Sequence, residues 1–220
     1  MFDKTIKDKS ILVGNTILFS KNKWVPFTEI NESLAILNHK IFDQAFNKIL
    51  KLHTPKYNVA FLSLCTSTRP YYLGRKWKHF KESFGGNSDL IVVSSGGIIP
   101  EKFWDSYPFL NYDGHTTPKG FEALYVKKMS NRLTRFFKKH SYDYVIANFR
   151  PNLRNAAIAD TVLKQLVAKK VIKDYKIIPD EDLYNDVKKR GFPRGKVFPD
   201  LDDKVLETLT KEINNFTKKL

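Results

Sequence analysis

Short apolar runs that alternate with amphipathic segments constrain the fold of this chain more than any other feature. Four of these runs predict buried strands, at residues 57–64, 89–93, 142–147 and 175–178. Between the first two runs, Leu73, Trp77 and Phe80 recur at helical spacing. Strands and helices that alternate at these lengths predict βαβ units, and hence a parallel, doubly wound sheet with helices on both faces.

Further helices complete this pattern along the chain. A helix that Thr28 can cap carries apolar residues from Leu34 to Leu52, and Pro55 ends it. The other helices are expected at residues 73–84, 119–140, 152–169, 180–189 and 202–218. Residues 11–27 predict two short extended pieces around residues 20–23. We therefore expect an N-terminal extension or hairpin over residues 1–27 and a single α/β domain over residues 28–220.

The composition fits a folded domain with an anionic partner. Of the 220 residues, 42% are hydrophobic and 14% aromatic, which is enough for a sizeable core. Basic residues outnumber acidic ones 38 to 23, giving a formal charge of +15. Such a charge favours a polyanion such as RNA and salt-sensitive binding. A lysine-rich surface from an AT-rich or thermophilic source is the alternative explanation.

Cysteine and histidine usage argues against metal sites and disulfides. With Cys65 alone, neither an intramolecular disulfide nor a cysteine zinc cluster can form. The five histidines show no metal-ligand spacing, so we expect no metal and no cofactor. The N-terminus lacks the apolar core of a signal peptide, and no apolar run is long enough to cross a bilayer. We therefore expect a cytoplasmic protein without a membrane partner.

Three loops that follow the expected strands carry polar side chains, at residues 65–72, 94–100 and 148–155. In open α/β sheets, ligands bind beyond the carboxyl ends of the strands. We therefore expect the three loops to converge at one rim of the sheet and to form a single cavity.

The first of these loops combines a thiol, hydroxyls, a guanidinium and two phenols. Cys65 is the candidate catalytic residue, because helix-end amides and Arg69 would favour its thiolate. Tyr71 beside Arg69 suits base stacking together with phosphate contact. The plainer alternative is that Cys65 is a small buried residue at the end of a strand.

The second and third loops supply further candidate substrate contacts. Ser94, Ser95 and Gly96 begin a Ser-Ser-Gly-Gly stretch whose backbone amides could bind an anion. A turn with permissive dihedral angles explains the same residues. Asn148 and Arg150 bring an amide and a guanidinium to the third loop, and a solvated surface arginine is the alternative there.

A basic stripe on the expected helix at residues 119–140 is the candidate surface for an RNA backbone. Its basic residues are spaced four, three and four apart, beside the apolar face of the helix. They are Lys128, Arg132, Arg135 and Lys139, and Arg154 of the third loop joins them. Such a stripe can follow a phosphate backbone, although simple solvent exposure also explains it.

The first loop and the segments after it resemble the core domain of archaeosine synthase, an archaeal enzyme that modifies 7-cyano-7-deazaguanine already placed in tRNA. The family signature is a cysteine, three residues, then Lys-Pro-Tyr, with a serine and a histidine further on. Cys65 and Pro70-Tyr71 match this signature. The stretches from Ser94 to Pro100 and from Tyr107 to Asp113 match two later blocks in order and spacing.

The match, which covers roughly residues 57–170, departs from the signature at three positions. Arg69 stands where lysine is usual, Gly74 at the serine position and Trp77 at the histidine position. The resemblance implies a three-layer α/β/α sandwich with a four-stranded parallel sheet, similar to the uracil-DNA glycosylases. The glycosylase motifs themselves are absent, because no Gln-Asp pair precedes Pro70 and the third loop lacks His-Pro-Ser.

The resemblance implies a tRNA-modifying transferase that adds lysine to the nitrile, with Cys65 as a nucleophile that forms a transient thioimidate. The residues expected to bind substrate are Arg69, Pro70, Tyr71, Ser94, Ser95, Gly96, Tyr112, Asp113, Asn148 and Arg150. The expected partners are tRNA, lysine and a second subunit of the archaeosine pathway. That subunit would supply the tRNA-binding module for which this chain is too short.

Two alternatives stay open. The first is a non-catalytic RNA- or nucleotide-binding module on a glycosylase-like fold. The second is a nucleobase glycosylase-like enzyme that acts on DNA.

Overall fold

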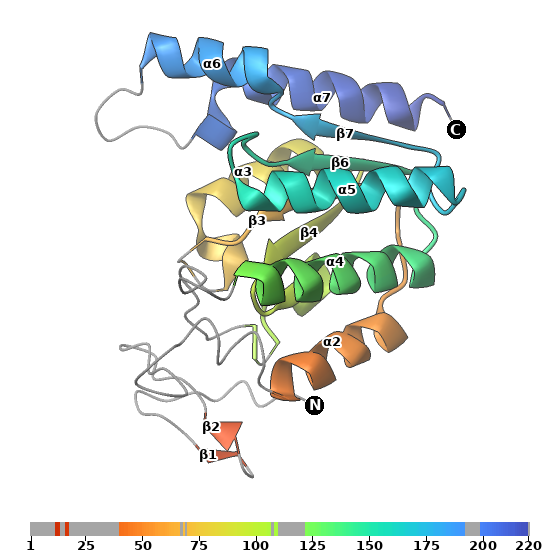
Figure 1. Cartoon of the computed structure of the whole chain (residues 1–220). Coiled ribbons are helices and arrows are strands. Elements are labelled where there is room, and N and C mark those ends of the chain that lie inside the picture. The colour runs from red at the N-terminus through yellow and green to blue at the C-terminus, as the bar shows by residue number, and fades with distance from the viewer. Residues whose placement is uncertain are drawn as a thin grey trace.

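A computed structural model of the chain shows a central sheet flanked by helices (Figure 1). The residues that it describes are 12–13, 16–17, 40–66, 68, 70–106, 108–109, 122–191 and 199–219. Near the N-terminus, β1 (Leu12–Val13) pairs antiparallel with β2 (Thr16–Ile17), so the chain reverses between these two strands. We expected the reversal at residues 20–23, which, like Thr28, lie outside the described residues.

Five strands form the main sheet, in the order β5-β4-β3-β6-β7. The four predicted strands are confirmed and run parallel, with β3 in the centre. They are β3 (Val59–Leu64), β4 (Asp89–Ser94), β6 (Tyr144–Asn148) and β7 (Asp174–Ile178). A fifth strand, β5 (Gly97–Pro100), pairs antiparallel with β4 at the edge of the sheet. The sheet is therefore mixed, and the prediction of a purely parallel, four-stranded sheet was wrong.

The hairpin between β4 and β5 explains this difference. Ser94 pairs with Gly97, so only Ser95 and Gly96 connect the two strands. Gly97 has a φ of +153°, a conformation that residues with a Cβ atom rarely adopt. Ser94–Pro100, which we expected to be a ligand loop, is thus a tight turn followed by a strand.

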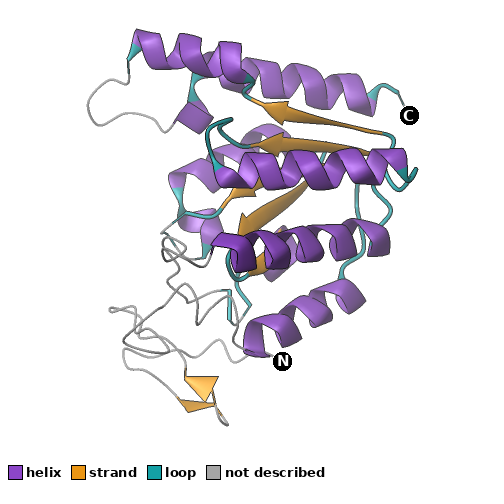
Figure 2. Cartoon of the chain, in the orientation of Figure 1, coloured by secondary structure: helices purple, strands orange, loops and turns teal. Residues whose placement is uncertain are grey.

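Helices cover both faces of the sheet (Figures 1 and 2). The helices of the described residues are α2 (Lys40–Leu52), α3 (Arg75–Phe84), α4 (Glu122–Lys139), α5 (Arg154–Ala168), α6 (Glu181–Arg190) and α7 (Asp203–Thr217). Short 3-10 helices span Tyr71–Leu73, Glu101–Phe103 and Pro199–Leu201. Helices α2, α4 and α5 form one layer, whereas α3 and α7 lie on the other face, with α6 beside α7. The predicted alternation of strands and helices is therefore confirmed.

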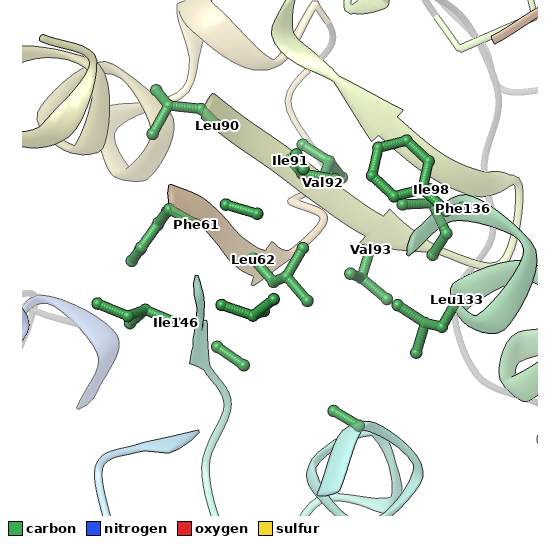
Figure 3. Packing of buried hydrophobic residues seen from close by; sticks show 14 of the residues in the cluster. Phe61, Leu62, Leu90, Ile91, Val92, Val93, Ile98, Leu133, Phe136 and Ile146 are labelled. Carbon is green, nitrogen blue, oxygen red and sulfur yellow. The ribbon is translucent and has the colours of Figure 1, made fainter. Parts of the chain in front are cut away.

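Apolar side chains from both faces of the sheet form the core. Figure 3 shows Val93 on the sheet and Leu133 and Phe136 on α4 within this buried cluster. On the other face, the ring of Phe61 meets that of Phe80 of α3 edge-on, with centroids 4.9 Å apart. Within the described part of the chain, no helix has the length and apolar character that a membrane span needs.

Candidate functional site

The carboxyl ends of β3, β4 and β6 meet at one edge of the sheet, which we call the rim. Leu64 pairs with Val93, so Cys65, the first residue after β3, lies beside Ser94, the last residue of β4. The backbone N–H of Cys65 donates to the carbonyl of Val93 (3.1 Å), and the residue is half-buried. On the other side of β3, Ser63 pairs with Asn148. The register thus brings the ends of all three strands together, whereas the expected common cavity stays a prediction.

A polar cluster of four residues, buried except for the partly exposed Arg150, lies at the rim, and we call it the rim cluster: Lys76, Asn148, Arg150 and Asp200. Nζ of Lys76 lies 2.9 Å from Oδ2 of Asp200, and only 5% and 7% of the two side chains are exposed. Nε of Arg150 lies 3.5 Å from Oδ1 of Asp200. Asn148 donates from Nδ2 to the backbone carbonyl of Asp200 (3.3 Å). Asp200 therefore joins α3 to the end of β6.

Two polar atoms of the rim cluster are buried without a hydrogen-bond partner among the described residues. They are Oδ1 of Asn148, an acceptor, and Nε of Arg150, a donor. Asn148 is 1% exposed. Buried polar atoms in proteins are nearly always hydrogen-bonded, so these two atoms, one of which also faces Asp200, are the candidate ligand contacts of the rim cluster.

Sequence reasoning missed Lys76 and Asp200. The signal for Lys76 was its place on α3 next to Trp77 and four residues before Phe80, on the buried side of the helix, where a lysine needs a buried anion. Its Nζ lies 5.8 Å from the centre of the Phe80 ring. Asp200 carried no comparable signal, because it lies far along the chain in a short 3-10 helix.

The first loop is only partly as expected. Tyr71 is fully buried, and its ring centroid lies 6.0 Å from that of Trp104. Tyr71 is thus a core residue in this structure, and the exposed phenol is that of Tyr72. Pro70 is partly exposed beside it, and Arg69 lies outside the described residues.

The turn after β4 is held by the protein's own groups. Oγ of Ser94 accepts a hydrogen bond from the N–H of Gly96 (3.0 Å). The carbonyl of Ser95 accepts one from Nη1 of Arg132 (2.6 Å). Two further predicted substrate contacts, Tyr112 and Asp113, lie outside the described residues.

The basic stripe of α4 divides into buried and exposed members. Arg132 is 3% exposed, and its Nη2 donates to Oδ1 of Asp43 on α2 (3.0 Å), so it braces the turn after β4 and presents little surface to RNA. Lys128 and Arg135 line a groove with it, whereas Lys139 and Arg154 are exposed elsewhere. This groove of about 460 Å³, the α4 groove, is lined by Asp43, Leu124, Lys127, Lys128, Asn131, Arg132 and Arg135.

A second polar cluster lies at the opposite edge of the sheet, where the strands begin; we call His53, Asp89, His140 and Tyr142 the amino-edge cluster. The hydroxyl of Tyr142 donates to Oδ2 of Asp89 (3.1 Å) and lies 2.7 Å from Nε2 of His53. The rings of His53 and His140 meet edge-on at 4.7 Å. Nδ1 of His53 and Nε2 of His140 are buried and have no partner within the described part of the chain.

Burial controls the protonation of this cluster. Desolvation, followed by the charge of Lys102, lowers the pKa of His53 to about 4. Desolvation also lowers the pKa of His140 to about 4, with smaller effects from His53 and Lys139. Burial raises the pKa of Tyr142 and that of Asp89. Both histidines are therefore neutral at pH 7.

Comparisons with known proteins place the chain among domains without an assigned activity. The crystal structure of AF0587, a protein of unknown function, is similar with a TM-score of 0.51 and 18% identity. The similarity covers 76% of this chain and 48% of AF0587, so the chain spans about half the length of that protein. No curated protein is significantly similar to the chain. The profile of one family, described as a domain of unknown function, matches residues 42–185, and the chain therefore belongs to the DUF5591 family.

Proposed function

We propose that the protein binds tRNA and adds lysine to the nitrile of 7-cyano-7-deazaguanine at the rim, alone or as one subunit of an archaeosine-forming enzyme with a glycosylase-like fold. The observation that carries the proposal is that β3 and β6 pair in parallel and end side by side, so that Cys65 follows β3 while Asn148 ends β6 and Arg150 follows it. The charge of +15 supports a nucleic-acid substrate. The resemblance of the first loop to archaeosine synthase supports the particular base.

The two atoms of the rim cluster that lack a hydrogen bond suit the edge of such a base, although Nε of Arg150 would have to turn from its ion pair with Asp200. A deazaguanine presents an N–H next to a carbonyl oxygen. Oδ1 of Asn148 would accept from that N–H, and Nε of Arg150 would donate to that oxygen. A base that fills both needs would satisfy two buried polar atoms at once, which favours a base of this kind over one without the donor–acceptor pair.

Cys65 would provide the covalent chemistry. Its sulfur adds to the nitrile carbon and a proton passes to the nitrile nitrogen, which gives a thioimidate. The amine of lysine then attacks the same carbon and the thiol leaves, so an amidine forms and Cys65 is regenerated. Half-burial leaves the thiol within reach of a substrate.

A second candidate, an RNA-binding module without catalysis, is favoured by Trp77. This residue stands where the resembling family has a histidine, and it is fully buried against Tyr71 and Trp104. Its indole cannot serve as an acid or a base. In this reading the rim binds the base and another subunit modifies it.

One experiment separates the two candidates. The purified protein is incubated with lysine and tRNA that carries the nitrile base, and the nucleosides are weighed by mass spectrometry. Catalysis predicts a nucleoside heavier by one lysine, no product with Cys65→Ser, and no product from tRNA that carries guanine at that position. Binding of tRNA without product would refute the catalytic proposal and support the module. Full activity of Cys65→Ser would refute the covalent step alone.

A further inference from the structure

The α4 groove is a basic depression between α2 and α4, on the face of the sheet opposite α3 and α7. Four of its lining residues are cationic: Lys127, Lys128, Arg132 and Arg135. Asp43 is the one acid among the lining residues, and its side chain is half-exposed. The lining therefore has an excess of positive charge, which attracts a polyanion.

Contacts within the groove hold three of its four cations in place. Arg132 is fixed between the carbonyl of Ser95 and Asp43, which also lies 3.6 Å from Nζ of Lys128. Nη2 of Arg135 donates to Oδ1 of Asn47 (2.7 Å). Ordered cations lose less side-chain entropy when they bind an anion than freely moving surface lysines do. A simple solvated face would not need this bracing.

The groove also has polar and apolar groups that suit a nucleic-acid strand. The exposed amide of Asn131 lies between the cations and can donate to a phosphate oxygen. Leu124 adds an apolar surface on which a sugar can rest. From Lys127 to Arg135 the helix advances about 12 Å. That length corresponds to roughly three nucleotides of one strand stacked as in a duplex, at about 3.4 Å of helix axis each.

The groove leads to the rim. Helix α4 runs antiparallel to the neighbouring strands, so its first residue, Glu122, lies at the edge of the sheet where those strands end (Figure 1). Arg132 connects the groove to the rim, because it lines the groove and donates a hydrogen bond to Ser95 in the turn that joins β4 to β5. A strand held along α4 would therefore reach the side of the sheet where Cys65 lies.

We infer that the α4 groove binds the phosphate backbone of one RNA strand, over about three nucleotides, and directs that strand toward the rim. This inference rests on the RNA-binding part of the proposed function. It does not require that the rim be catalytic. Lys127, Lys128 and Arg135 would contact the phosphates, and Arg132 would line the bottom of the groove in its fixed position.

The test compares two triple variants that remove the same charge. The groove variant is Lys127→Gln/Lys128→Gln/Arg135→Gln. The control is Lys164→Gln/Lys169→Gln/Lys176→Gln, three exposed lysines that do not line the groove. Binding of an unmodified tRNA transcript is measured by fluorescence anisotropy from 50 to 300 mM salt, and thermal melting confirms that each variant is folded.

The inference predicts that the groove variant binds tRNA one to two orders of magnitude more weakly near 0.1 M salt, with a slope of log K against log salt that is flatter by about 2. The control should lose much less affinity. Equal losses in the two variants, or wild-type affinity of the folded groove variant, would overturn the inference. Competition by polyglutamate as effective as competition by RNA would also overturn it, because an acidic polypeptide would then fit the groove as well.

A single substitution that removes a negative charge from the groove should have the opposite effect and strengthen tRNA binding. Asp43→Asn removes the carboxylate that competes with phosphate but keeps an oxygen for Arg132. It should tighten tRNA binding several-fold relative to Glu207→Gln, which removes an exposed acid on α7. Equal effects of the two substitutions would count against the groove. If the groove variant loses RNA binding and the wild-type protein makes no nucleoside product, the inference about the groove holds and only the catalytic proposal is refuted.

Discussion

The amino-edge cluster predicts that acid destabilises this protein well above the pH at which carboxylates are protonated. His53 and His140 have pKa values near 4 in the folded chain and about 6.5 in an unfolded one. The unfolded state therefore binds more protons between these values. The stability that the neutral histidines contribute is complete above pH 6.5 and is lost as the pH falls toward 4.

The size of this effect follows from the same two values. At pH 5 each histidine lowers the free energy of unfolding by at most about 2 kcal/mol relative to pH 7, and near pH 5.5 it contributes a slope of about 1.2 kcal/mol per pH unit. Asp89 acts in the opposite direction, because its raised pKa stabilises the fold as the pH falls. The total loss at pH 5 is therefore smaller than twice the value for one histidine.

Urea unfolding at pH 7, 6, 5.5 and 5 measures this loss. The buried Trp77 and Trp104 provide a fluorescence signal from the core. His140→Phe keeps an aromatic ring against Phe136 but removes one titrating group, so it should roughly halve the slope between pH 6 and 5. Val162→Ala, a core substitution on α5, should lower stability equally at every pH.

An unchanged slope in His140→Phe would show that this ring does not take up its proton on unfolding. A wild-type stability that is flat between pH 7 and 5 would contradict the burial argument for both histidines. Steep loss that begins only below pH 4.5 would point to carboxylates instead.

Two substitutions at the rim have calculable costs. Asp200→Asn leaves the buried ammonium of Lys76 without a counter-charge, so urea unfolding should show a loss of about 3–5 kcal/mol, part of which the double variant with Lys76→Met recovers. Undiminished stability of Asp200→Asn would mean that the pair is exposed to solvent. Gly74→Ser restores the serine of the resembling family, but its Cβ would lie 3.2 Å from the carbonyl oxygen of Tyr71 and 3.3 Å from Cβ of Thr68. Because Gly74 is the N-cap of α3, a serine hydroxyl there would offset part of this steric cost, so the expected net loss is at most about 1 kcal/mol, seen as a slightly lower melting temperature, and a raised one would refute the steric argument.

The sequence predicted the regular elements well because each has a strong period or a continuous apolar run. The strand at residues 57–64 is confirmed as Val59–Leu64, and the helix at residues 119–140 as Glu122–Lys139. β5 was missed because it is four residues long and begins with a glycine, so its sequence looks like a loop. A short apolar stretch after Gly-Gly is better interpreted as the second arm of a hairpin.

Side-chain roles were harder to predict, because they depend on which side of an element faces its neighbours. Tyr71 and Tyr72 are adjacent and chemically alike, yet one is in the core and the other is exposed. Arg132 follows the spacing of Lys128 and Arg135 but turns inward, where the carbonyl of Ser95 in the turn after β4 accepts its hydrogen bond. Such contacts depend on tertiary neighbours that helical periodicity alone does not specify.

The ion pair between Lys76 and Asp200 has a consequence for where this domain ends. The match to the family stops at residue 185, whereas Asp200 and the whole of α7 come later. A fragment trimmed to the matched region would leave a lysine stranded in an apolar interior and would uncover Tyr144, on which Phe216 stacks with a centroid separation of 4.5 Å. The boundary by which relatives are recognised is thus shorter than the unit that can fold, and expression trials should retain the chain through Thr217.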